Sequence, residues 1–135
     1  KARKKDIIFN EINLDWSQEI TLTEGPFDLF KCNQNATCLL GSKLSSSSYL
    51  FKKIVSNRTP VLLALDRDMR KDARKIADLL EDYNINVRVI DLGEFQDVGE
   101  MNKKDFHLAR NNASRWSREM SLREKIAAIQ TGSLV

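Results

Sequence analysis

The sequence predicts an α/β domain with a mostly parallel sheet of about four strands, helices on both faces and a helical C-terminal appendage. Short apolar runs alternate with segments of helical periodicity, an order typical of right-handed βαβ crossovers. Two of these runs stop at acidic clusters. At 135 residues, 41% of them hydrophobic, the chain fits one compact domain with an adequate core.

The first half of the chain predicts three strands joined by two helices. A short helix is expected from Pro26 to about Asn33, and one of the serines at 45–48 is expected to cap the next helix. That second helix turns Leu50, Ile54 and Val55 inward. The four expected strands, including one in the second half, are residues 20–23, 36–40, 61–65 and 86–92.

The third strand is followed by the clearest helix of the chain, which Asn84 is expected to end in a left-handed conformation. Beyond Gly93 the pattern is polar and helical, without further predicted strands. A capping box at Ser121–Glu124 is expected to open a last short helix that Gly132 stops. The apolar face of the clearest helix comprises Ala73, Ile76, Ala77, Leu80 and Tyr83.

The chain divides into an N-terminal extension (1–18), a core (19–101) and a helical C-terminal extension (102–135). A net charge of +3 leans mildly toward polyanionic partners. The two cysteines, Cys32 and Cys38, form neither a disulfide framework nor a zinc pattern, and we expect free thiols. No apolar stretch reaches the length of a membrane span, so a cytoplasmic protein is expected, in the host cytoplasm if viral.

Carboxylates follow two of the predicted strands. Glu24 and Asp28 come after the first, and Asp66 and Asp68 come after the third. In a parallel sheet the carboxyl ends of strands form the mouth where ligands usually bind. Carboxylates that repel one another there need a counter-cation, and hard oxygen ligands suit Mg²⁺ or Mn²⁺.

These motifs together resemble the Toprim domain, and in order and spacing they are most similar to the version in bacterial-type and phage DNA primases. The resemblance covers about residues 19–101. It rests on the strand followed by Glu24-Gly25-x-x-Asp28, the turn Leu39-Leu40-Gly41-Ser42, the strand followed by Asp66-x-Asp68, and Asp97 in a later acidic turn.

The resemblance implies roles for these residues. Glu24 would act as general acid or base or help to hold metal, and Asp66 and Asp68 would hold Mg²⁺. Asp97 matches the first acid of the family's D-P-D motif. Val98 and Gly99 replace its proline and second aspartate, so either Glu100 substitutes or a second ion is held loosely.

Several of these residues also have purely structural interpretations. Asp28 is equally explained by the helix dipole. The Asp66-x-Asp68 motif could also be an N-cap plus a solvated acid ahead of a helix, an interpretation that would be reasonable for Asp68 alone. Lys43, Arg67, Arg70 and Lys71 could bind nucleotide or nucleic-acid phosphates, as could Arg74 and Lys75. The basic helix face could equally be solvated, balanced by Asp72 and Asp78. Trp16 and Trp116 are more typical of core packing than of base stacking.

Two function classes follow from the resemblance. The first is the catalytic Toprim piece of a DNA primase, a Mg²⁺-dependent nucleotidyltransferase that makes RNA primers. It would use single-stranded DNA template and ribonucleoside triphosphates, with a replicative helicase or a separate primase subunit as partner, or missing flanking domains. The alternatives are a Toprim nuclease and a non-catalytic module that binds nucleic acid or the replisome. The printed residues contain no recognisable zinc ribbon or helicase motif, which supports the non-catalytic module.

Overall fold

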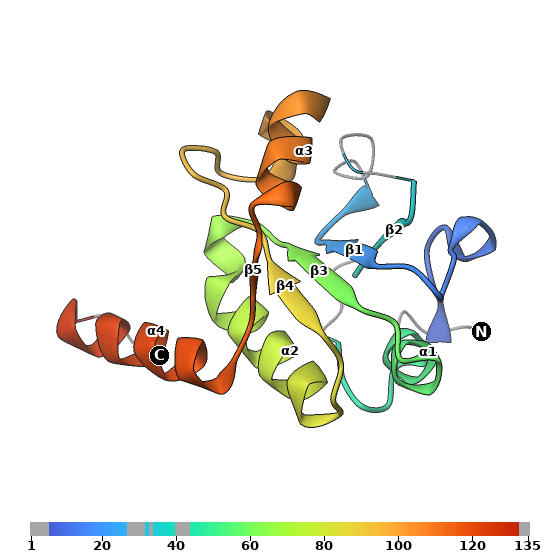
Figure 1. The fold of residues 1–135 in the computed structure, drawn as a ribbon, viewed down its shortest axis with the longest axis horizontal. Coiled ribbons are helices and arrows are strands. Elements are labelled where there is room, and N and C mark those ends of the chain that lie inside the picture. Colours follow the sequence, from blue (N-terminus) through green and yellow to red (C-terminus); the bar gives the residue numbers. More distant parts are fainter. Residues whose placement is uncertain (1–5, 27–31, 33, 40–43, 133–135) are drawn as a thin grey trace.

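The sheet is the centre of the fold. The computed structural model describes residues 6–26, 32, 34–39 and 44–132. It has five strands in the order β2-β1-β3-β4-β5 (Figure 1). The first four run parallel and the last is antiparallel to β4, which confirms the predicted α/β class and adds one strand. The strands are β1 (Ile20–Thr23), β2 (Ala36–Cys38), β3 (Val61–Ala64), β4 (Val87–Val89) and β5 (Ser114–Arg115).

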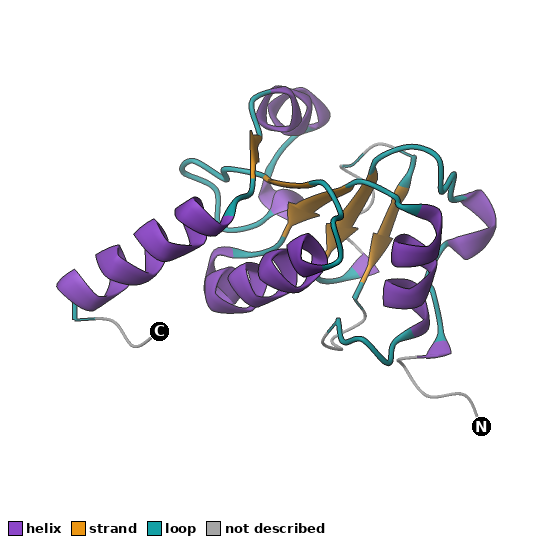
Figure 2. Ribbon diagram, turned by 60° about the horizontal axis from the view of Figure 1, so that its bottom comes forward, coloured by secondary structure: helices purple, strands orange, loops and turns teal. Residues whose placement is uncertain are grey.

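Helices cover both faces of this sheet, as predicted. Figure 2 shows α1 and α2 on one face and α3 on the other, while α4 extends away from the body. None of the helices in the described ranges is long and apolar enough to cross a membrane. The helices are α1 (Tyr49–Asn57), α2 (Arg70–Asp82), α3 (Lys103–Asn111) and α4 (Arg118–Gln130), with short 3-10 turns η2 (Glu11–Asn13), η4 (Arg67–Met69) and η5 (Val98–Glu100).

The core is divided by the sheet into two clusters. Side chains alternate across a strand, so Leu63 of β3 joins the cluster beneath α1 and α2, while Leu62 and Ala64 join the cluster beneath α3. All four residues of β3 are buried. This explains why β3 reads as a continuous apolar run, as parallel strands covered on both faces do.

The helix ends follow the local signals in the sequence. Ser48 caps α1, its Oγ accepting from Phe51 N–H at 3.2 Å. Asn84 has a φ of 62° after α2, as predicted. Ile85 N–H donates to Leu80 C=O and Asn84 N–H to Glu81 C=O, the pair of bonds that defines a Schellman motif.

The predicted apolar face of α2 is confirmed except at its last member. Ala73, Ile76, Ala77 and Leu80 are buried, but Tyr83 is 47% exposed. Tyr83 stands one residue past the end of α2, where the helical periodicity no longer applies. Its ring still packs edge-on against Phe51, with the centroids 5.0 Å apart.

The expected capping box at Ser121–Glu124 is wrong. Helix α4 begins at Arg118, with Ser117 as N-cap accepting from Met120 N–H at 3.2 Å, so the cap stands four residues before the expected one. Ser121 is instead buried inside the helix and donates to Asp78 at 2.8 Å. The capping box that does form opens α3, between Asn102 and Asp105.

The segment between α3 and α4 also departs from the prediction. It contributes β5, paired with β4, and places Trp116 in the core at 2% exposure. The indole Nε1 donates to Asp78 at 2.9 Å, so core packing rather than base stacking is the role of this tryptophan. The predicted helix from Pro26 to Asn33 and the turn at 41–42 lie mostly or wholly outside the described residues.

Candidate functional site

Two of the predicted acidic strand ends are neighbours at one edge of the sheet. β1 pairs in parallel with β3, with Thr23 opposite Ala64. Glu24 directly follows β1 and Asp66 is the second residue after β3. Because paired strands lie about 4.8 Å apart, the two acids leave neighbouring chains at the same edge. From β1 the chain goes to β2 on one side and later to β3 on the other, so this edge is the topological switch point.

The Asp66-x-Asp68 segment does not serve as a helix cap. Asp66 stands at the N-cap position of η4 but makes no side-chain capping bond. The N-cap of α2 is Met69, also without one. Asp66 is half-buried and Asp68 is exposed. The capping interpretation of this motif therefore has no support in the hydrogen bonds, and the carboxylates remain candidates for ligand binding.

The loop that carries Asp97 is tied to the same segment. Arg67 N–H donates to Gln96 C=O at 3.0 Å, and Arg67 Nε donates to Phe95 C=O at 2.7 Å. Asp97 itself caps η5, accepting from Glu100 N–H at 3.0 Å. Arg67 is a candidate phosphate ligand in the sequence. In the structure, at least one donor of its side chain holds this loop in place instead.

The side chains do not converge on one point. Among the described residues, no three histidine, cysteine, aspartate or glutamate side chains are grouped closely enough to hold a metal ion. The donor chemistry is right for Mg²⁺ or Mn²⁺, and the backbone places Glu24 and Asp66 on adjacent strand ends. Convergence would therefore need side-chain rotation. The candidates Asp28 and Lys43 lie outside the described residues.

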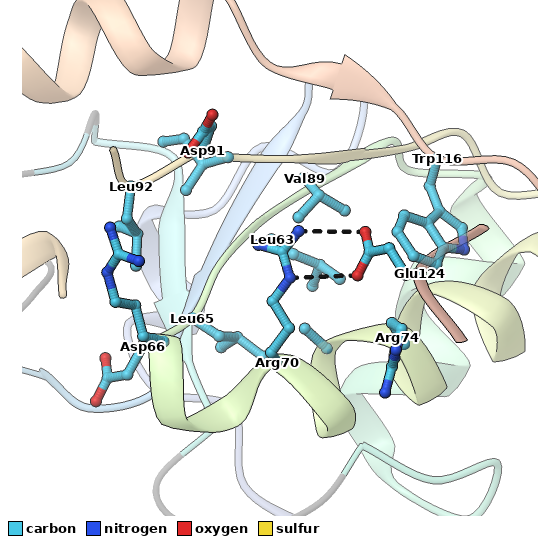
Figure 3. A pocket seen from close by; sticks show the side chains of 13 residues that line it. Leu63, Leu65, Asp66, Arg70, Arg74, Val89, Asp91, Leu92, Trp116 and Glu124 are labelled. Atoms are coloured by element: carbon cyan, nitrogen blue, oxygen red, sulfur yellow. Dashed lines mark hydrogen bonds and ion pairs between the residues drawn. The ribbon is translucent and has the colours of Figure 1, made fainter. Parts of the chain in front are cut away.

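The sequence did not predict a pocket that Asp66 also lines. It lies between α2, β4 and α4, has a volume of about 50 Å³, and is called the α2–α4 pocket here. Figure 3 shows Arg70 reaching across it to Glu124 of α4, with Trp116 beside the pair. Both bonds of that ion pair measure 3.2 Å. The remaining charged residues of the lining are Asp66, Arg67, Arg74 and Asp91.

A signal for this pocket was present in the sequence but was not decisive. Arg74 follows Ala73 and precedes Ile76 and Ala77, so it stands on the edge of the apolar face of α2. An arginine in that position is common, because its aliphatic stem packs at the edge of the apolar face while its charge reaches water. Glu124 and Trp116 follow Arg74 by about forty residues or more in the sequence, so no local pattern relates them to α2. Lys71, the fourth predicted phosphate ligand, is exposed on α2 and does not line the pocket.

Comparison with known proteins supports the fold. No protein-family model matches the sequence, and no curated protein matches it. The structure is similar to that of the zinc-binding and RNA polymerase domains of the Aquifex aeolicus primase, with a TM-score of 0.68 and 22% sequence identity. The match covers 92% of this chain and 35% of that chain. At this identity the likeness shows the fold alone.

Proposed function

We propose that this chain is the catalytic Toprim piece of a DNA primase, which makes RNA primers on single-stranded DNA. The observation that carries the proposal is the pairing of β1 with β3, which puts Glu24 and Asp66 on adjacent strand ends at the switch point. The fold shared with a bacterial primase supports it. Because the match covers only 35% of that primase structure, template binding is assigned to flanking domains or to a partner such as a replicative helicase.

Each acidic residue has a role in this proposal. Glu24, Asp66 and Asp68 would hold Mg²⁺ or Mn²⁺, with Asp97 and Asp28 as weaker contributors. The bound ion would neutralise charge that develops on the phosphoryl group during nucleotidyl transfer. Glu24 would also take the proton from the attacking ribonucleotide 3′-hydroxyl as a general base, or supply one to the leaving pyrophosphate as a general acid. Arg67, Arg70, Lys71 and Lys43 would attract the nucleotide phosphates.

A non-catalytic module that binds nucleic acid or the replisome is the second candidate. The observation in its favour is that no three candidate metal ligands are grouped within the described part of the chain. A Toprim nuclease would use the same carboxylates for phosphodiester cleavage.

Primer synthesis separates these candidates. The chain is mixed with single-stranded template, labelled ribonucleotides, Mn²⁺ or Mg²⁺ and its replication partners. We expect short RNA products that disappear in Glu24→Gln and Asp66→Asn. Template binding should survive both changes, because it depends on cationic contacts with phosphates.

A matched control is Glu11→Gln, a carboxylate-to-amide change in η2. Asn10 next to it donates to Ala36 C=O at the start of β2, which places η2 at the opposite edge of the sheet. Primer synthesis unchanged in Asp66→Asn would contradict the catalytic assignment. Cleavage of labelled DNA without ribonucleotides would indicate the nuclease, and template binding without either reaction would indicate the non-catalytic module.

A further inference from the structure

Residues 66–69 carry two of the proposed metal ligands but contain no buried residue. Asp66 and Met69 are partly buried, and the two residues between them are exposed. Neither η4 nor the helix α2 that follows it has a side-chain bond at its N-cap. A segment with few core contacts opens locally at low cost unless other contacts hold it. The direction of Asp66 and Asp68 therefore depends on what else this segment touches.

Arg67, which stands between the two aspartates, ties the segment to the loop before η5. Its backbone N–H donates to Gln96 C=O at 3.0 Å, and its Nε donates to Phe95 C=O at 2.7 Å. An acid flanks Arg67 on either side, yet no ion pair joins it to a carboxylate of the described residues. The side chain is therefore used to hold the loop carbonyl rather than to neutralise its neighbours.

The loop is the better anchored of the two partners. Val98 of η5 is fully buried and Met101 is 2% exposed, both within the core cluster beneath α3. Phe95 packs against the same cluster. Gln96 N–H also donates to Glu100 Oε1 at 2.8 Å, which closes the loop on itself. Arg67 therefore attaches the exposed aspartate segment to a loop that the core already holds.

We propose that Arg67 is a positioning residue for the metal site. Its bond to Phe95 C=O holds Asp66 and Asp68 in the orientation from which they bind the divalent cation. Ligands that are held in advance lose less conformational entropy when the ion binds, so the affinity is higher. The inference rests on the proposed function for the identity of the site. The bond uses Nε of Arg67 and leaves its two Nη nitrogens for the phosphate contact.

One substitution separates this role from two simpler roles of Arg67. Arg67→Met keeps an unbranched aliphatic side chain but removes the donor and the positive charge. If Arg67 acted only through its charge, its removal would make the site more negative and Mn²⁺ would bind more tightly. If Arg67 only contacted phosphates, the affinity for Mn²⁺ without nucleotide would not change. A positioning role predicts weaker binding.

The test measures Mn²⁺ binding to the whole chain by electron paramagnetic resonance, without nucleotide. We expect Arg67→Met to weaken Mn²⁺ binding about fivefold to tenfold, the effect of losing one hydrogen bond. The matched control is Arg70→Met, which removes the same charge three residues later. Arg70 reaches Glu124 and not the loop, so its replacement should not weaken Mn²⁺ binding (Figure 3).

Hydrogen exchange in buffer with EDTA provides a second readout that needs no metal. The amide hydrogens of Arg67 and Met69 are both hydrogen-bonded, to Gln96 C=O and Asp66 C=O. Arg67→Met should speed exchange of the amides at positions 67 and 69 at least severalfold. Exchange in β3 should not change, because the substituted side chain is exposed and the core is intact.

Three results would overturn the proposal. The first is Mn²⁺ binding that is unchanged or tighter in Arg67→Met. The second is unchanged exchange at positions 67 and 69. The third is equal weakening in Arg70→Met, which would show a general effect of removing a cation. Absence of Mn²⁺ binding by the wild-type chain would instead contradict the proposed metal site, and the exchange comparison would still show whether Arg67 fixes the segment.

Discussion

Arg88 of β4 and Glu19, the residue before β1, are joined across β3 by two hydrogen bonds of 2.8 Å each. Nη1 of Arg88 also donates to Arg110 C=O at 3.0 Å, in the last turn of α3. The hydrogen bonds that Arg88 donates to Glu19 raise the pKa of the guanidinium above its usual value. A single side chain therefore fixes the start of β1, the middle of β4 and the end of α3.

Arg88→Met should lower the free energy of unfolding by about 1 to 3 kcal/mol, because it removes a largely shielded ion pair and its carbonyl contacts. Chemical denaturation at neutral pH measures this. A raised pKa means that the contribution is complete below the unfolded pKa and is lost only as the pH rises through the folded pKa, so it should be constant from neutral to moderately alkaline pH. A double-mutant cycle with Glu19→Gln isolates the pair. Additive effects of the two changes would show that the ion pair contributes nothing.

Mn²⁺ or Mg²⁺ at millimolar concentration should raise the melting temperature. A cation bound by Glu24, Asp66 and Asp68 would relieve the repulsion between these carboxylates in the folded state only. Asp66→Asn should abolish most of this shift, and Glu11→Gln should preserve it. Differential scanning fluorimetry over a metal titration is sufficient. A wild-type melting temperature that does not respond to Mn²⁺ would favour the non-catalytic module.

Arg58→Gly should stabilise the protein by about 0.5 to 1 kcal/mol. Arg58 has a φ of 51° at the end of α1, a left-handed conformation that glycine adopts without steric cost. Thermal unfolding compares it with Arg58→Ala, which keeps the Cβ and should give no such gain. Destabilisation by glycine would mean that the Arg58 side chain makes a contribution larger than the backbone strain.

Asp78→Ala should loosen the C-terminal helix and cost about 1 to 3 kcal/mol of folding free energy. Asp78 accepts from both Trp116 Nε1 and Ser121 Oγ, and both residues are buried, so their donors would be left unsatisfied. Hydrogen exchange in α4 should increase locally. Asp82→Ala, also on α2, is the control. It removes an exposed ion pair with Arg118, and such a pair contributes little to the free energy of folding. Equal losses in the two variants would contradict a specific role for Asp78.

The sequence by itself determined the class of the fold and some of the helix ends. The alternation of apolar runs with helical periodicity is a local pattern, and so are the signals at Ser48 and Asn84, which depend on neighbouring backbone groups. The position of acids just past β1 and β3 was equally readable, because parallel strands present their carboxyl ends at one edge.

The tertiary structure alone decided how the C-terminal segment is used. Ser117 and Ser121 can both cap a helix by local chemistry, and in the structure Ser117 caps α4 while the Ser121 hydroxyl donates to Asp78 of α2. The same contact set brings Trp116 into the core and Glu124 to Arg70. These partners are separated by 38 to 54 residues, so no pattern of period 2 or 3.6 can join them. The sequence pattern predicts that Glu24 and Asp66 follow strands whose ends lie together. The direction in which each carboxylate points depends instead on packing and on any bound cation.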